Sequence, residues 1–172
     1  MKRVAVAVVL ALLASAGCGY HTGGHAARLP AGIHVLSVPV FANKTQTYKI
    51  EQVLTRDVVR ELISRTKYSV VSRTEEPADA VLTGTVLTTQ AAPLTYDPQS
   101  GRVSSALVTV TVSVSLKDRA GRVLFENPNY TFREQYQVSR EISSFFDEGT
   151  PALQRISQDF ARTLVSDILE AY

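Results

Sequence analysis

The chain has 172 residues, with 18 lysines and arginines against 16 aspartates and glutamates. Residues 1–17 hold two of the basic residues and none of the acidic ones, so residues 18–172 carry 16 of each (18 minus 2 for the basic ones). This balance excludes a general nucleic-acid-binding surface, because such a surface needs a net basic charge. Residues 18–172 suffice for one domain with a real core and are too few for two.

Residues 1–17 have the pattern of a secretory signal peptide. Lys2 and Arg3 precede an almost purely apolar run over residues 4–14, and the small residues 15–17 follow it. The alternative is a transmembrane anchor. The apolar run is too short for one, because a membrane-spanning helix needs about 20 apolar residues.

Residues 15–18, Ser-Ala-Gly-Cys, resemble the lipobox of bacterial lipoproteins, although Ser15 stands where that pattern prefers Leu. The resemblance implies that Cys18 receives a diacylglycerol on its sulfur and an acyl chain such as palmitate on its new amino terminus. Cys18 is the only cysteine, so it has no disulfide partner in the chain. Gly19 after it is typical of outer-membrane lipoproteins. We expect residues 18–31 to form a lipidated, flexible tether without a metal or another cofactor.

The folded part begins with a strand and a helix. Residues 33–41 are mostly apolar and predict a strand, in which Pro39 favours a sheet edge or a bulge. Residues 49–66 repeat their apolar positions with a helical period. The predicted apolar stripe consists of Ile50, Leu54, Val58 and Leu62, widened by Val59 and Ile63. The opposite face, interpreted as solvated and paired, holds Arg56, Asp57, Arg60 and Glu61.

Two further short strands and a loop are predicted next. Residues 68–72 and 80–90 are β-branched and apolar, which favours strands. Residues 91–101 contain Pro93, Pro98 and Gly101, and this composition predicts a loop or a wide hairpin turn.

The clearest pattern in the chain is a strict alternation over residues 106–116. Apolar residues occupy the even positions, which predicts a long strand with one apolar face and one hydroxyl-rich face. The hydroxyl-rich face is formed by Thr109, Thr111, Ser113 and Ser115. Residues 118–121 are a turn with glycine at its end, and residues 122–136 can return antiparallel, interrupted at Pro128.

A closing helix is predicted from Thr150 and Pro151 to the C-terminus, because apolar residues recur there at spacings of three and four. The whole pattern predicts a single α+β domain over residues 32–172. We expect a two-layer sandwich in which two amphipathic helices pack on one face of a four- or five-stranded mixed or antiparallel sheet.

No motif for catalysis or for metal binding occurs in the sequence. The chain lacks a nucleophile elbow, a phosphate-binding glycine loop and any zinc spacing. His34 lies in a predicted strand and is interpreted as a structural or surface residue. We therefore expect a binding protein and not an enzyme.

Several segments together resemble the LptE family of lipopolysaccharide-assembly lipoproteins. They are residues 18–21 (CGYH), 29–30 (LP), 54–65 (LTRDVVRELISR) and 78–86 (ADAVLTGTV), followed by the long strand, the Gly121 turn and the closing helix. The resemblance implies a small domain that plugs a large outer-membrane β-barrel, LptD, in a one-to-one complex. It also implies a role in carrying lipopolysaccharide to the cell surface and direct contact with lipid A. The domain would face the periplasm or lie within the barrel lumen.

Two sets of side chains are candidates for these contacts. The hydroxyl-rich strand face (Thr109, Thr111, Ser113 and Ser115) suits a polar barrel lumen. Lipid A phosphates need cations, and cations gather at the two turns. The candidates are Arg102, Lys117, Arg119 and Arg122. The alternative is that these charges only keep turns soluble and strand edges unpaired.

A second family resemblance is confined to the first third of the mature chain. Residues 34–45 (HVLSVPVFANKT) and 50–62 (IEQVLTRDVVREL) are similar to lipoproteins of the CsgG and LpoB type. That type includes a secretion-pore subunit and an activator of a peptidoglycan synthase. A third alternative is a periplasm-facing lipoprotein with an unrelated binding function.

Overall fold

The computed structural model of the protein describes residue 29 and residues 32–72, 77–138 and 149–171. The predicted signal peptide and most of the predicted tether lie outside these residues. In chain order the elements are β1 (Val35–Ser37), β2 (Ala42–Asn43), α2 (Ile50–Arg65), β3 (Ser69–Val71), β4 (Ala80–Tyr96), β5 (Val103–Asp118), β6 (Val123–Gln137) and α3 (Gly149–Glu170).

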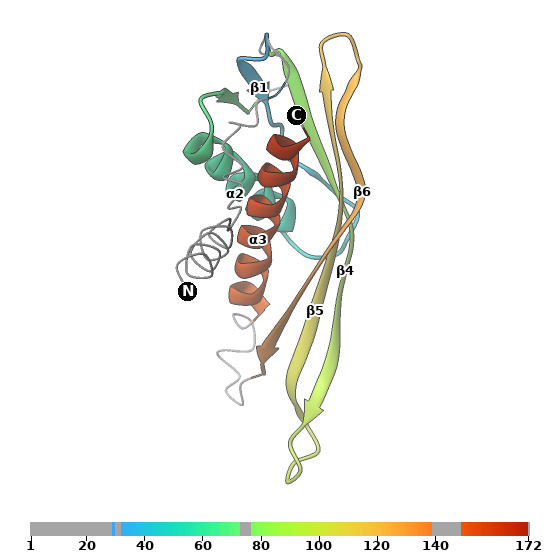
Figure 1. The fold of residues 1–172 in the computed structure, drawn as a ribbon. Coiled ribbons are helices and arrows are strands. Elements are labelled where there is room, and N and C mark those ends of the chain that lie inside the picture. The colour runs from blue at the N-terminus through green and yellow to red at the C-terminus, as the bar shows by residue number, and fades with distance from the viewer. Residues whose placement is uncertain (1–28, 30–31, 73–76, 139–148, 172) are drawn as a thin grey trace, which may run out of the picture.

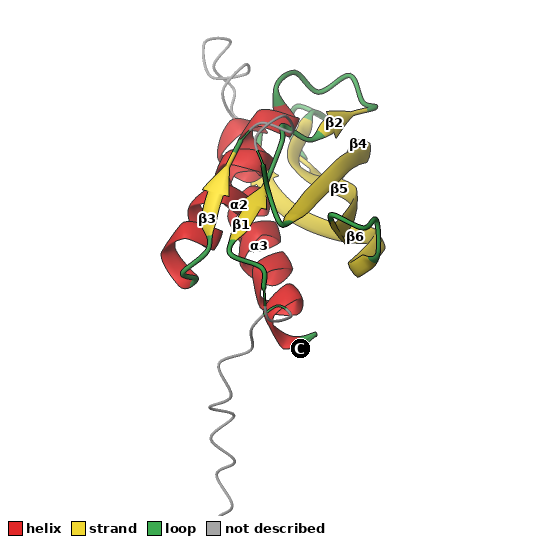
Figure 2. Cartoon of the chain, turned by 90° about the horizontal axis from the view of Figure 1, so that it is seen from above, coloured by secondary structure: helices red, strands yellow, loops and turns green. Residues whose placement is uncertain are grey.

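The strands form one mixed sheet in the order β3-β1-β4-β5-β6, with the two-residue β2 beside β4. Strand β1 is parallel to both β3 and β4, whereas β5 is antiparallel to both of its neighbours, β4 and β6. Helices α2 and α3 lie side by side on one face of this sheet (Figures 1 and 2). The predicted α+β fold with two helices on one sheet face is confirmed, with six strands in place of four or five.

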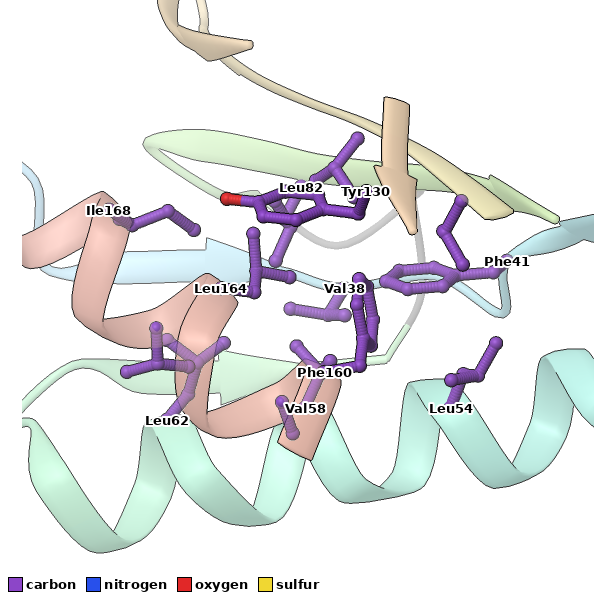
Figure 3. Close-up of a cluster of buried hydrophobic side chains, with 14 of the residues drawn as sticks. Val38, Phe41, Leu54, Val58, Leu62, Leu82, Tyr130, Phe160, Leu164 and Ile168 are labelled. Atoms are coloured by element: carbon purple, nitrogen blue, oxygen red, sulfur yellow. The ribbon is translucent and has the colours of Figure 1, made fainter. Parts of the chain in front are cut away.

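The apolar face of β5 and the stripe of α2 bury each other as the sequence predicts. Val110, Val112 and Leu116 are at most 1% exposed. The predicted α2 stripe of Ile50, Leu54, Val58 and Leu62 is buried as well. Figure 3 shows Leu54, Val58 and Leu62 pointing from α2 toward α3 and the sheet. Val59 packs against the core, but Ile63 is 58% exposed, so it was wrong to include it in the stripe.

Phe160 of α3 is the centre of the core, between the two layers. Its ring lies 6.2 Å from that of Phe41, 5.8 Å from that of Tyr130 and 5.7 Å from that of Phe132, in edge-on arrangements (Figure 3). Gly84 makes room for this cluster. A Cβ atom built on Gly84 lies only 2.5 Å from the Phe41 ring, so a larger residue there must displace a buried aromatic side chain.

Three predicted boundaries differ from the structure. The strand predicted over residues 33–41 is interrupted at Pro39, so that β1 ends at Ser37 and β2 starts at Ala42. Residues 91–96, predicted as a loop, continue β4. Pro93 is tolerated there because no described strand pairs with the other edge of β4 beyond Val86, so that edge needs no N–H donor. Strand β6 runs through Pro128, with an irregularity in its pairing at Val112 and Val114.

Candidate functional site

The hydroxyl-rich side chains of β5 lie on the sheet face that points away from the helices, and their neighbours extend this face over three strands. Thr83 and Thr85 of β4 are paired with Ser115 and Ser113, and Thr131 of β6 is paired with Thr111. We call this three-strand surface the outer sheet face. The Thr111 and Thr131 hydroxyl oxygens lie 3.4 Å apart.

Charge on the outer sheet face is sparse. The register places Arg133 beside Thr109 and Glu126 beside Ser115, and the intervening pair is Thr111 with Thr131. Thr109, Thr111, Ser113 and Ser115 are each half-buried within this surface. A neutral surface of hydroxyl groups can make many weak hydrogen bonds to a polar partner without desolvating charges.

Arg102 lies at the tip of a hairpin that extends beyond the helices. Strands β4 and β5 form this hairpin, and its far end has no helix over it in Figure 1. Asp97 organises the turn, since its carboxylate accepts hydrogen bonds from the backbone N–H groups of Gln99 (2.9 Å) and Ser100 (2.8 Å). Leu94 and Tyr96 are 45% and 59% exposed beside it. The Arg102 side chain is exposed and forms no salt bridge with any described residue.

Lys117, Arg119 and Arg122 lie at the other end of β5. Arg122 Nε is 3.0 Å from Asp118 Oδ2, and an Arg119 nitrogen is 3.4 Å from Asp79 Oδ1. Arg119 Nε also donates to the Ala78 carbonyl oxygen. Strand β5 spans 16 residues, so these cations lie about 50 Å from Arg102 at about 3.3 Å per residue. The four predicted lipid contacts therefore form two separate groups.

Two aspartates order the β5–β6 turn: Asp79 links it to the backbone before β1, and Asp118 closes the turn itself. Asp79 Oδ2 accepts the backbone N–H groups of His34 and Val35, each at 2.9 Å, and these bonds hold the pKa of Asp79 below its ordinary value. The backbone N–H of Arg122 likewise lowers the pKa of Asp118, helped by the Arg122 charge. His34 is exposed, as its interpretation as a surface residue requires.

These two lowered pKa values predict a loss of stability in acid. Each carboxylate stabilises the folded state while ionised, fully above its unfolded pKa of about 3.9, and this stabilisation is lost as pH falls through the lower folded pKa. We expect the melting temperature of Asp79→Asn to fall less between pH 5 and pH 2.5 than that of wild type. Asp159→Asn, which changes an exposed carboxylate on α3, is the control. Equal falls in wild type and Asp79→Asn would contradict the prediction.

A buried polar contact joins the two helices, and the sequence interpretation missed it. Asp57, predicted to face solvent, is 1% exposed. Its carboxylate lies 2.7 Å from Arg60 Nη2 of α2, 3.0 Å from Gln154 Nε2 and 2.6 Å from Ser157 Oγ of α3. Asp57 is therefore a structural residue between α2 and α3, in spite of its place among charged neighbours.

The described part of the chain holds neither a metal-ligating cluster nor a membrane-spanning helix. Nowhere in that part of the chain do three or more histidine, cysteine, aspartate or glutamate side chains come together as metal ligands could. Among the same residues, no helix is both long enough and apolar enough to span a membrane.

The fold and its surfaces define a class of small α+β domain, with two helices on one sheet face and a long projecting hairpin. The family model LptE, described as lipopolysaccharide-assembly, matches residues 33–168, which is well over half of the chain. The chain belongs to the LptE family. This match covers nearly the whole described domain, whereas the resemblance to the CsgG and LpoB type covers only its first third. A search of curated proteins finds no match.

Several solved structures share the fold, two of lipoproteins and one of a PelC variant among them. Rare lipoprotein B from Shewanella oneidensis has a TM-score of 0.54 at 15% identity, over 77% of this chain and 94% of that chain. An uncharacterized lipoprotein B from Nitrosomonas europaea has a TM-score of 0.53 at 15% identity, over 85% and 87%. A PelC dodecamer from Paraburkholderia phytofirmans has a TM-score of 0.52 at 19% identity, over 77% and 85%. At these identities the likeness concerns the fold alone.

Proposed function

We propose that this protein is a lipid-anchored outer-membrane lipoprotein that plugs the LptD β-barrel in a one-to-one complex and helps to assemble it. The complex would deliver lipopolysaccharide to the cell surface. The family match over residues 33–168 carries this proposal. The neutral outer sheet face supports it, since a polar barrel lumen is complementary to hydroxyl groups.

A charge placed on the outer sheet face tests the contact with the barrel. Thr111→Arg or Ser113→Arg buries an uncompensated charge in the interface, which costs about 3 kcal/mol or about a hundredfold in affinity. We expect the complex with LptD to be lost in pull-downs from detergent extracts, while the melting temperature of the isolated domain stays unchanged. The wild-type complex should persist at high salt, because enclosed neutral contacts are not screened.

Thr163→Arg is the matched control, since it adds the same charge on an exposed position of α3. It should leave the barrel bound. If wild-type pull-downs recover a peptidoglycan synthase or a secretion pore and no barrel, the protein acts as the CsgG and LpoB type does. If Thr111→Arg retains the barrel, the outer sheet face is not the contact surface.

We further propose that Arg102 binds a phosphate of lipid A at the hairpin tip. Its guanidinium is exposed and forms no salt bridge with the described residues, so it can bind a phosphate with two parallel hydrogen bonds. Exposed Leu94 and Tyr96 offer apolar contact beside it. At the other end of β5, Arg119 and Arg122 each share their guanidinium with an aspartate, so they have fewer free donors than Arg102.

The charge reversal Arg102→Glu is expected to weaken lipopolysaccharide binding by the purified domain about tenfold or more, since a charge-assisted pair contributes about 1.5–3 kcal/mol. The melting temperature should not change, because the side chain packs against nothing in the core. The comparison is a Lys117, Arg119 and Arg122 triple glutamine variant, which should weaken lipopolysaccharide binding less than Arg102→Glu does. If only the triple variant weakens binding, the lipid A site lies at the β5–β6 turn.

A further inference from the structure

Leu29, the first residue that the structure describes, is docked on the core of the domain. Leu29 is 4% exposed and belongs to the core, and its backbone N–H donates to Tyr68 Oη at 2.9 Å. Ile33 is 9% exposed and packs in the same core. The chain is therefore docked on the core at Leu29 and Ile33, beside the starts of β1 and β3.

The β5–β6 turn lies at this same end of the molecule. Ala80, the first residue of β4, is paired with Leu36 on one side and with Asp118 on the other. The Asp79 carboxylate completes the link, because it binds the backbone of His34 before β1 and the side chain of Arg119 after β5. Arg102, at the hairpin tip, lies at the opposite end, about 50 Å away for a 16-residue strand.

The length of chain before Leu29 limits how far this end can lie from a lipid on Cys18. Only residues 19–28 stand between Cys18 and Leu29 in the sequence. A segment of this length spans at most about 40 Å when fully extended. As a flexible chain it spans about 18 Å on average. A lipid on Cys18 thus holds the end with the β5–β6 turn close to the membrane surface and leaves the hairpin tip free to lie much farther away.

The β5–β6 turn presents its cations outward and its carboxylates inward. The side chains of Arg119 and Arg122 are 65% and 72% exposed, whereas those of their partners Asp79 and Asp118 are 23% and 15% exposed. A guanidinium carries five N–H donors, so each arginine keeps free donors after pairing with one carboxylate. Lys117 is exposed beside them.

We propose that the β5–β6 turn is a membrane-contacting surface, at which Lys117, Arg119 and Arg122 bind the phosphate groups of anionic phospholipids in the leaflet that holds the anchor. This inference rests on the proposed lipidation of Cys18. The contact orients the domain, with the turn at the headgroups and the hairpin tip directed away from that leaflet. Arg119 and Arg122 thereby form ion pairs that stabilise the turn and also bind lipid phosphate groups.

Fluorescent probes at the two ends test the orientation. The full lipidated chain is reconstituted into vesicles of phosphatidylethanolamine and phosphatidylglycerol that contain a lipid with a quenching headgroup. Because Cys18 is the only native cysteine and its sulfur is acylated, Ala120→Cys and Gln99→Cys each offer one labelling position. We expect strong quenching of the probe at position 120 and little at position 99. Stronger quenching at position 99 would overturn the inference.

The charge dependence separates binding from simple tethering. Vesicles of neutral phosphatidylcholine, or salt at about 1 M, should reduce quenching at position 120, since the screening length falls to about 3 Å at that salt concentration. Arg119→Gln, which removes one charge, should weaken the attraction about fivefold. Lys117→Glu, which breaks no ion pair of the described residues and changes the charge by two units, should weaken it more strongly. Asp159→Asn is the control. Equal quenching in neutral and anionic vesicles would refute the proposed phosphate contacts.

Two further outcomes distinguish the premise from the inference. If the chain does not float with vesicles of either composition, Cys18 is not acylated and the inference fails with its premise. Alternatively, the chain floats with vesicles, yet the probe at position 120 is quenched only when lipopolysaccharide replaces phosphatidylglycerol. In that case the turn binds lipopolysaccharide, and the proposed phospholipid contact is wrong. Recovery of LptD in pull-downs is independent of both results.

Discussion

Asp57→Ala is expected to lower the free energy of unfolding by about 3 kcal/mol, because breaking a buried ion pair costs about 3–5 kcal/mol. We take the lower end of this range because Arg56 and Arg60 are 58% exposed and regain water once their partner is gone. Gln154 and Ser157 do not regain water so readily, since Ser157 is 1% exposed at the contact between α2 and α3.

Urea denaturation of the isolated domain measures this effect. The control is Glu61→Ala, which removes a more exposed carboxylate that lies 3.5 Å from Arg65 on the same helix. A surface pair of this kind contributes about 0.5 kcal/mol or less. A loss below about 1 kcal/mol for Asp57→Ala would fit the solvated helix face predicted from the pattern, because exposed pairs contribute that little.

Periodicity predicts most of the fold because it records which face of each element is buried. The stripe of α2 and the alternation of β5 each identify their buried side chains, and both are borne out apart from Ile63. Periodicity does not predict the burial of Asp57. Its neighbours on the helix surface are arginines, and only the position of α3 turns that face into a buried contact.

Two other features depend on tertiary pairing that local sequence does not record. Pro93 signals a loop by its composition, yet it is compatible with β4 because no described strand pairs with the far edge of β4 at that point. Gly84 lies within strand β4, where no turn requires a glycine. It is required because the Phe41 ring lies against it, and these two residues are far apart in the sequence.

The candidate sites were only half predictable for a different reason. The hydroxyl-rich face followed directly from alternation, and the register extends it to Thr83, Thr85 and Thr131. The cations were grouped by their chemistry, although the long strand between Arg102 and Lys117 already implies that they lie at opposite ends. The length of the alternating run in the sequence therefore predicts the separation of these two groups of cations.

Cys18→Ser is expected to abolish the lipid anchoring of the domain, so that only its contacts with LptD and with headgroups remain to hold it at the membrane. One acyl chain gives only marginal binding, whereas the diacylglycerol and N-acyl chain expected on Cys18 together make anchoring effectively stable, at about 0.8 kcal/mol per buried methylene. The serine variant lacks the sulfur on which all of this depends. The folded domain should keep its melting temperature, because Cys18 lies well before Leu29, the first residue that the structure places in the core.

Cell fractionation and intact-mass measurement of the membrane-bound protein check this expectation. Wild type should begin at Cys18 and carry the mass of three acyl chains, while the variant should lack this added mass, and it should either leave the membrane fraction when LptD is absent or retain residues 1–17. Ser15→Leu is the matched control, since it brings residues 15–18 closer to the lipobox and should be processed at least as well as wild type. An unmodified Cys18 on membrane-bound wild-type protein would mean that another contact holds the domain at the membrane. The exposed cations of the β5–β6 turn would then be the first residues to test, because they are charged groups at the end where the chain enters the domain.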